Sequence, residues 1–247
     1  MTKQAEIDYP DRIGEAGRTH LRGKPFSDAE APSRLIAMGA ILGLLPPRPA
    51  DILDCGVGGG WTSRFLARAG YRVVGVDISP RMIAIAEEDR AREGLAGVSL
   101  QVSDYETSPF AEQFGAVLFF DALHHAEDEA AAIGAAYRAL RPGGVLVTYE
   151  PGEGHAASEA GAHARAEWGV TEKDMPPWRI IELARALGMH SARVLPDPTA
   201  VERIVFGRAR TPRDEKRLSF RLIRLAAFAK LLFVRHYRRS SIVVLRK

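Results

Sequence analysis

The sequence predicts an α/β fold in which helices flank a doubly wound, seven-stranded and mostly parallel sheet. Between residues 50 and 150, five short apolar runs alternate with segments of helical periodicity. One of these runs, Ala116–Phe120 (AVLFF), is apolar at every position, as buried parallel strands tend to be. Two later runs, Ser191–Leu195 and Ile242–Leu245, bring the expected number of strands to seven, and we expect the last strand to be antiparallel.

Composition excludes several other classes of protein. The chain has 247 residues, of which 46% are hydrophobic and 26% are charged, so it suits one large domain with additions and is too apolar for a disordered chain. The single cysteine, Cys55, excludes a disulfide scaffold and indicates a reducing compartment. No stretch approaches the roughly 18 apolar residues of a membrane span, and the first residues contain no apolar secretory signal. We therefore expect a cytoplasmic protein.

Residues 1–45 are expected to form an N-terminal cap. Residues 1–27 are mixed in character, include glycines and prolines, and predict an irregular flap. Apolar residues at helical spacing then predict a helix that ends before Pro46, namely Leu35, Met38, Leu42 and Leu45. In the flap, Arg18, Arg22 and Lys24 are candidates for contact with an anionic group, although this segment would also suit a solvated linker.

Residues 46–247 are expected to form a single domain that begins with five strands. Ser79 as an N-cap followed by Pro80 marks a helix start, and Pro142 marks a helix stop. The predicted strands are Asp51–Cys55, Tyr71–Asp77, Val98–Val102, Ala116–Phe120 and Val145–Tyr149. The predicted helices run from about Trp61 to Ala69, from Pro80 to Arg92 and up to Leu140.

The C-terminal part of this domain contains three further segments. Residues 151–202 begin with a polar stretch rich in glycine and histidine, which predicts a flexible lid, and continue with a helix from about Trp178 to Leu187. A basic amphipathic helix is predicted at about residues 213–239, and a last strand at residues 241–246. The apolar stripe of the basic helix consists of Leu218, Leu222, Leu225, Ala229 and Leu232.

Charge is unevenly distributed along the chain. Residues 203–247 contain 14 Lys and Arg against two acidic side chains, whereas residues 1–202 contain 20 basic and 29 acidic ones. Three interpretations of the basic helix compete: leucines packed on the core, peripheral contact with an anionic membrane or a partner protein, and contact with nucleic acid. Because the acidic remainder of the chain would repel a long polyanion, we expect no nucleic-acid partner.

The most informative motif is a glycine loop, Asp54–Gly60 (DCGVGGG), that joins the first strand to the next helix. Glycines let the backbone turn tightly and let a ligand approach without meeting a Cβ atom. A dinucleotide site requires the spacing G-x-G-x-x-G, but Trp61 stands at the third glycine position counted from Gly56. The motif instead reads D-x-G-x-G-x-G, which favours a cofactor without a pyrophosphate.

Acidic side chains follow the next two strands. Asp77 ends the second strand, 23 residues after Asp54, where a carboxylate can accept hydrogen bonds from both ribose hydroxyls. Asp104 follows the third strand and could accept a hydrogen bond from an adenine amino group, with Tyr105 beside the ring. These positions predict a nucleoside-binding site at the carboxyl edge of the sheet.

Five motifs in this order resemble the class I S-adenosylmethionine-dependent methyltransferases. They are DILDCGVGGGW, VVGVDIS, VSD, FFDALHH and LRPGGVLVTYEP, and together they cover roughly residues 50–150. The resemblance implies a Rossmann-like fold, S-adenosylmethionine as cofactor and methyl transfer as the reaction. Cys55 departs from the family, which usually has an aliphatic residue there, and we interpret it as a small buried apolar side chain.

The resemblance also implies roles for individual residues. Gly56 and Gly58 would shape the methionine pocket, and Asp121, after the fourth strand, would face the methionine amino group. Asp77 would hold the ribose, and Ile78 would pack on the adenine. The full set of expected cofactor-binding residues is Asp54, Gly56, Gly58, Asp77, Ile78, Asp104, Tyr105 and Asp121.

Histidines are the candidate catalytic residues. Methyl transfer from a sulfonium is an in-line displacement, so holding the acceptor at attack distance supplies much of the catalysis. A hydroxyl acceptor also needs a base to take its proton, ideally one whose pKa lies near the working pH. His124 and His125 follow the fourth strand and His155 follows the fifth, and each histidine could instead have a structural hydrogen-bonding role. An alternative for this region is a divalent-metal site, although no fixed ligand spacing supports one. Its ligands would be Asp121, His124, Glu150, Glu153 and His155.

We expect methyl transfer to a hydroxyl of a small molecule or glycan, with a histidine as general base. The layout, including GRTHLRGKPFS and GEGH, resembles methyltransferases of bacterial cell-surface glycan or natural-product synthesis. One alternative is a C- or N-methyltransferase of a quinone, amine or natural product. Another is a noncatalytic cofactor-binding partner in a glycan-assembly complex.

Overall fold

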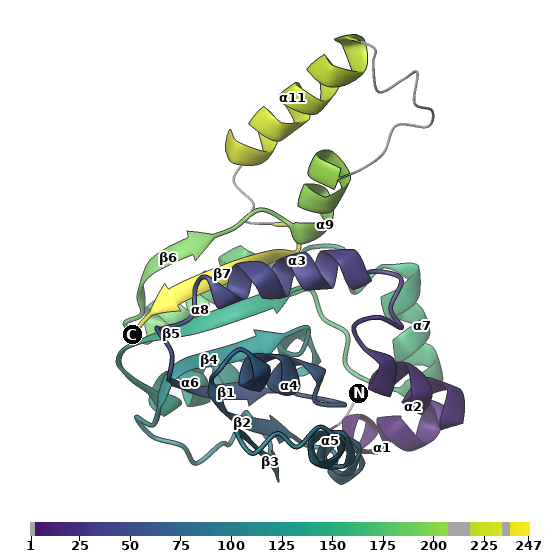
Figure 1. Cartoon of the computed structure of the whole chain (residues 1–247), viewed down its shortest axis with the longest axis vertical. Helices are drawn as coiled ribbons and strands as arrows, with labels where there is room; N and C mark the ends of the chain where they lie inside the picture. The colour runs from purple at the N-terminus through teal and green to yellow at the C-terminus, as the bar shows by residue number, and fades with distance from the viewer. Residues whose placement is uncertain (1–2, 207–217, 234–237) are drawn as a thin grey trace.

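The computed structural model describes residues 3–206, 218–233 and 238–247, and its centre is a seven-stranded sheet (Figure 1). The strands follow the order β3-β2-β1-β4-β5-β7-β6, and only β7 runs antiparallel to its neighbours. This arrangement confirms the predicted doubly wound sheet with its antiparallel last strand. The strands are β1 (Asp51–Cys55), β2 (Arg72–Asp77), β3 (Val98–Val102), β4 (Phe114–Phe120), β5 (Leu140–Glu150), β6 (His190–Val194) and β7 (Ser241–Arg246).

Helices cover both faces of the sheet and enclose two apolar cores. On one face, α3 (Ala31–Leu42) and α4 (Trp61–Arg68) bury Met38, Ile41 and Leu66 against alternate residues of the central strands. On the other face, α6 (Glu129–Ala139) and α8 (Pro177–Ala186) pack on the remaining residues of those strands. Strands buried on both faces are apolar at every position, which is why Ala116–Phe120 carries no polar residue.

The N-terminal segment differs from the irregular flap that the sequence predicts. It forms two helices, α1 (Lys3–Arg12) and α2 (Gly14–Gly23). The helix α1 packs against α5 (Pro80–Arg92) and α7 (Glu159–Trp168), and its Ala5 and Pro10 are buried. Tertiary contacts therefore outweigh the local preferences of the glycines and of Pro10.

A second departure lies in the polar stretch after β5, which contains the helix α7. The Ser158 hydroxyl accepts a hydrogen bond from the Gly161 amide, and Gly169 ends the helix with φ of 72°. Ser158 and Gly169 are an ordinary start signal and stop signal, but the glycines and histidines of the stretch from residue 152 to residue 163 led to the prediction of a flexible lid. The strand β5 also begins earlier than predicted, at Leu140, and includes Pro142 and the two glycines after it.

The basic helix is observed as α11 (Leu218–Phe233), so residues 213–217 and 234–237 of the prediction lie outside the described residues. It is preceded by α9 (Pro198–Val201) and a π-helical turn, η2 (Glu202–Phe206), and it stands apart from the sheet (Figure 1). Leu222 and Leu225 are largely exposed, so the interpretation that the leucine stripe packs on the core is wrong for the described side chains. No helix in the described ranges is long and apolar enough to span a bilayer.

Candidate active site

A cavity of about 1070 Å³ opens at the carboxyl ends of the central strands. Its wall combines residues from the glycine loop, from the ends of β2 to β5, and from the N-terminal helices. The predicted site residues that line it are Gly56, Gly58, Asp77, Ile78, Asp104, Tyr105, Asp121, His124, His125 and His155. Among the expected cofactor-binding and catalytic residues, only Asp54 is absent from this wall.

The glycine loop lies where no larger residue fits. Gly56 and Gly60 both have positive φ, of 71° and 75°. A Cβ atom on Gly56 would lie 2.7 Å from the Ala122 side chain, and one on Gly60 would lie 2.7 Å from Ala86. Because these glycines have no Cβ atom, the loop backbone can pack directly against the segment after β4 and against α5.

Asp54 supports this loop from below. Its Oδ2 accepts hydrogen bonds from the Thr62 and Ser63 hydroxyls, each at 2.6 Å, and its side chain is buried. Burial raises the pKa of Asp54 to about 6, although both hydroxyls oppose the rise. Asp54 therefore positions the loop against the start of α4 and does not reach the cavity.

Carboxylates stand at the nucleoside end of the cavity. Asp77 accepts hydrogen bonds from the amides of Gly58 (2.8 Å) and Ser79 (2.9 Å), which orient its carboxylate. Asp104 accepts from the Glu106 amide and pairs with Lys3 of α1 at 2.5 Å. The Tyr105 ring lies edge-on to Phe119, and its hydroxyl donates to the Ala122 carbonyl.

The helix α1 forms one wall of the cavity with residues that sequence reasoning missed. Lys3 pairs with Asp104 and, at 2.9 Å, with Glu106. Glu6 Oε1 accepts a hydrogen bond of 2.6 Å from the Thr171 amide, and burial raises its pKa to about 7. Lys3 and Glu6 are three residues apart and so lie on the same face of α1. This spacing is the one feature of the sequence that could have indicated that both line the same site.

The opposite end of the cavity carries both signs of charge. Arg34 of α3 binds Asp121 and Asp28, each at 2.7 Å. Burial favours a raised pKa for Asp121, but the charges of Arg34, His124 and Lys24 outweigh it and hold the pKa well below its usual range. Lys24 also lines the cavity, and burial together with the Arg34 charge lowers its pKa. An α-amino acid group needs this combination of cations and a carboxylate.

The other two basic candidates of the N-terminal segment, Arg18 and Arg22, pair with acidic side chains outside the cavity. Arg18 pairs with Glu15, and Arg22 pairs with Glu88 and Asp89 of α5. Neither Arg18 nor Arg22 lines the cavity. Of the three basic residues considered in this segment, only Lys24 can contact a bound anionic group.

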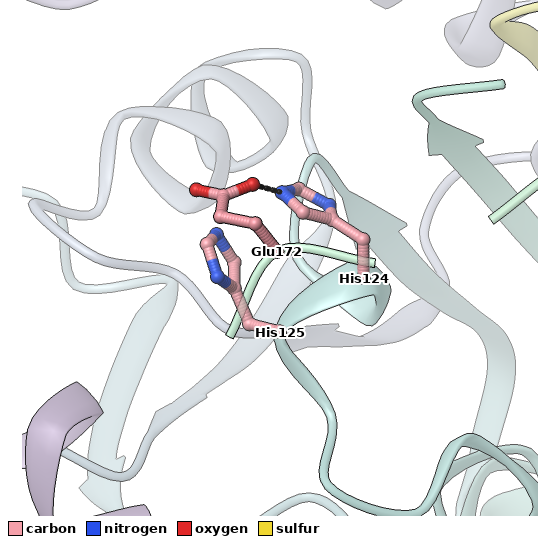
Figure 2. Close-up of side chains that lie close together, drawn as sticks. All are labelled: His124, His125 and Glu172. Atoms are coloured by element: carbon pink, nitrogen blue, oxygen red, sulfur yellow. Dashed lines mark ion pairs between the residues drawn. The ribbon is translucent and has the colours of Figure 1, made fainter. Parts of the chain in front are cut away.

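Three histidines that follow β4 and β5 line the cavity. Figure 2 shows two of them, His124 and His125, with Glu172 beside both. His124 Nδ1 lies 2.7 Å from Glu150 Oε2, and its Nε2 lies 3.5 Å from Glu172 Oε2. Glu150 is fixed by the amides of Ala122 and Leu123. Burial favours a lowered pKa for His124, but the hydrogen bond and charge of Glu150 outweigh it and raise the pKa to about 9.

His125 is in the opposite state. Burial and the neighbouring His124 charge lower its pKa to about 4. Its Nδ1 lies 2.6 Å from the Thr171 carbonyl, which can only accept, so Nδ1 carries the proton and Nε2 offers a free lone pair. The His125 side chain is 30% exposed against 4% for His124, so a ligand in the cavity reaches His125 more readily.

His155 is engaged with Glu172, whose role the sequence did not suggest. Its Nε2 lies 2.6 Å from Glu172 Oε2. The histidine hydrogen bond and the neighbouring histidine charges outweigh burial and lower the pKa of Glu172. Because Glu172 follows no predicted strand, nothing in its local sequence marked it.

The alternative divalent-metal site of the sequence analysis is not assembled, because its expected ligands have other partners. Asp121 pairs with Arg34, Glu150 pairs with His124 and backbone amides, and Glu153 accepts from the Trp178 indole. Within the described residues, a different group has cation-binding spacing: one ligand atom each of His124, His125 and Glu172 lies within 4.8 Å of the others. Each of these three side chains also has a partner among the protein's own groups.

Comparison with known proteins agrees with this geometry. Residues 53–148 match the family model described as "Methyltransferase domain". A "Ubiquinone biosynthesis O-methyltransferase" of Cereibacter sphaeroides (strain KD131 / KCTC 12085) is 33% identical over 103 residues, which are 42% of each chain. The present chain thus matches about two fifths of the length of that relative.

Solved structures share the fold at low identity. Haemonchus contortus phosphoethanolamine N-methyltransferase 2, in complex with S-adenosyl-L-methionine, superposes with a TM-score of 0.68 and 24% identity, covering 100% of this chain and 60% of that one. The [4+2]-cyclase SpnF superposes with a TM-score of 0.59 and 20% identity, covering 91% and 84%. Since one fold carries both names, the fold alone does not specify the reaction.

Proposed function

We propose that the protein transfers a methyl group from S-adenosylmethionine to a hydroxyl of a small molecule, because residues 53–148 match the methyltransferase-domain family model. One observation carries the proposal. Two adjacent histidines in the cavity wall have pKa values driven apart, to about 9 for His124 and about 4 for His125. Such a pair supplies both an acid and a base at neutral pH.

The cavity suits the nucleoside of the cofactor. Asp77 is held by two backbone amides and keeps lone pairs for the ribose hydroxyls. Ile78 and Tyr105 provide apolar surface in the same wall, and Asp104 provides an acceptor for the adenine amino group. Lys3 occupies that acceptor in this structure, so we infer that α1 shifts or shares Asp104 when adenine binds.

The other end of the cavity suits the methionine part. Arg34 and Lys24 would pair with its carboxylate, and Asp121 would accept from its ammonium group. When bound, S-adenosylmethionine supplies an electrophilic methyl group on a sulfonium.

Proton transfer falls to the histidine pair. His125 Nε2 would take the proton from the acceptor hydroxyl as the oxygen–methyl bond forms, because it is neutral and exposed to the cavity. The His124 imidazolium, neutralised by Glu150 and Glu172, would stabilise the developing oxyanion. His155 would position Glu172.

A hydroxyl acceptor is favoured over an amine for two reasons. An amine is already nucleophilic when neutral and gains little from an adjacent imidazolium, whereas an oxyanion is stabilised by it. In addition, the curated relative is named an O-methyltransferase of ubiquinone biosynthesis. A phenol or catechol is therefore the first acceptor class to test, ahead of a glycan hydroxyl or an amine.

The experiment is a product analysis with S-[methyl-³H]adenosylmethionine. The purified protein is offered matched acceptors that differ only in the nucleophile: a catechol, a sugar diol and an arylamine. We expect label in the methyl ether of the catechol. Label only in the arylamine would overturn the assignment to hydroxyls, and binding of S-adenosylhomocysteine without any turnover would favour a noncatalytic partner.

A further inference from the structure

The helix α11 displays an apolar surface that no part of the described structure covers. Side chains are described for residues 222–229 of this helix. Four large apolar ones among them are between 43% and 66% exposed. They are Leu222, Ile223, Leu225 and Phe228. In a monomer in water, a contiguous apolar patch of this kind marks an interaction surface.

The position of α11 is set by its attachment to η2. Its main contacts are with η2, where Arg224 donates hydrogen bonds to the carbonyls of Ile204 (3.1 Å) and Val205. Arg224 therefore ties one side of the helix to the body, and the exposed apolar side chains lie elsewhere on its surface. Figure 1 shows the helix standing beyond α9, away from the sheet.

Charge identifies the surface that α11 fits. The helix contains Arg221, Arg224 and Lys230 and no acidic residue, within a segment of 14 basic and two acidic side chains. A second copy of the chain would bring two such segments together and repel. A bilayer with anionic headgroups instead accepts the apolar side chains below its surface and the basic ones at its surface.

We propose that α11 docks the protein onto an anionic lipid bilayer. The helix is too short and too charged to span the bilayer and would lie in the interface. Its two flanks lead back into the cavity wall, through Arg203 on one side and Arg239 and Ser240 on the other. Docking would hold the cavity close to the lipid surface. A consequence that rests on the proposed function is that the acceptor has an apolar part retained in the bilayer.

The test is flotation of the full-length protein with vesicles of phosphatidylcholine alone, or of phosphatidylcholine with phosphatidylglycerol. We expect binding to the anionic vesicles at low ionic strength and a loss of about tenfold or more at about 0.5 M salt, because salt screens the headgroup charge. The double variant Ile223→Asp/Leu225→Asp should also bind about tenfold less well. Its matched control is Leu187→Asp, an exposed leucine after α8 that should leave binding unchanged.

Several outcomes would overturn the proposal. One is a wild-type protein that does not float with anionic vesicles at low salt, and another is a double variant that floats as well as the wild type. A wild-type dimer that becomes monomeric in the double variant, without vesicle binding, would assign the surface to a second copy. Titration with S-adenosylhomocysteine separates this test from that of the proposed function, since the double variant should bind it as the wild type does.

Discussion

His124 and His125 are consecutive residues whose pKa values are shifted in opposite directions from the ordinary histidine value. Their ring centroids are 4.0 Å apart, so a charge on one ring strongly disfavours a charge on the other. Glu150 decides which ring is charged, because it binds His124 at 2.7 Å. The turn after β4 thus places the two rings side by side, and Glu150 of β5 separates their pKa values.

The pH profile of kcat/KM reports this separation. The base His125 must be neutral, so activity should be lost as the pH falls through its pKa of about 4. The His124 imidazolium must be charged, so activity should be lost as the pH rises through about 9. We expect a plateau between these limits, and an acid limb near the ordinary histidine pKa of about 6.5 would contradict the assignment.

A variant sharpens the same measurement. His124→Gln removes the positive charge that depresses the pKa of His125, so the acid limb should move to higher pH and the alkaline limb should disappear. His190→Gln, on the exposed strand β6, should leave both limbs in place. An unmoved acid limb in His124→Gln would mean that another group is the base.

At the scale of residues, the sequence predicted the side chains that follow strands. Asp77, Asp121 and the two histidines lie at strand ends, and all of them line one cavity because parallel strands end at one edge of a sheet. Glu172 and Arg34 come from segments that tertiary packing alone brings to the cavity. A single sequence contains no local signal for such residues.

At the scale of elements, α1 is a movable part of the cavity wall in this account. Lys3 and Glu6 line the cavity and hold α1 to Asp104 and to the Thr171 amide, while the helix packs on α5 and α7 outside the two apolar cores. An element outside the core opens at a lower free energy than a core helix. We therefore expect α1 to open as cofactor enters and leaves.

The variant Glu6→Ala tests this role. It leaves the Thr171 amide without its acceptor and loosens α1, so the dissociation rate of S-adenosylhomocysteine should rise by about three- to tenfold, the equivalent of one hydrogen bond. Stopped-flow displacement measures that rate. Glu15→Ala, an exposed residue of α2 paired with Arg18, is the control. Equal dissociation rates in the two variants would show that α1 does not retain the ligand.

Helices outside the sheet were the least predictable elements. The helices α1 and α7 contact one another, and neither shows a strong apolar stripe in its sequence. The helix α11 shows the reverse, because its apolar residues follow a helical period, and the large ones among its described side chains, at positions 222–229, are exposed. Periodicity indicates that a helix has an apolar side, while the partner of that side depends on the rest of the fold or on another surface.

At the scale of the whole molecule, the fold followed from alternation and burial. Five apolar runs separated by helical segments allow few topologies once crossovers are right-handed, and the observed strand order is one of these. The position of β7 between β5 and β6 could be anticipated only through the family resemblance. The charge asymmetry of the sequence corresponds to two places in the molecule. Acidic groups line the nucleoside end of the cavity, and basic groups lie in and around α11.

The central claim is that His125 takes a proton from an acceptor hydroxyl during methyl transfer from S-adenosylmethionine. The most direct measurement compares ³H-methyl transfer to a catechol by the wild type, His125→Ala and His190→Ala, with S-adenosylhomocysteine affinity measured on each. The account predicts that His125→Ala loses turnover by a factor of about 10² to 10⁴, typical of a lost general base, while affinity is unchanged and His190→Ala retains both. Full turnover in His125→Ala would contradict it.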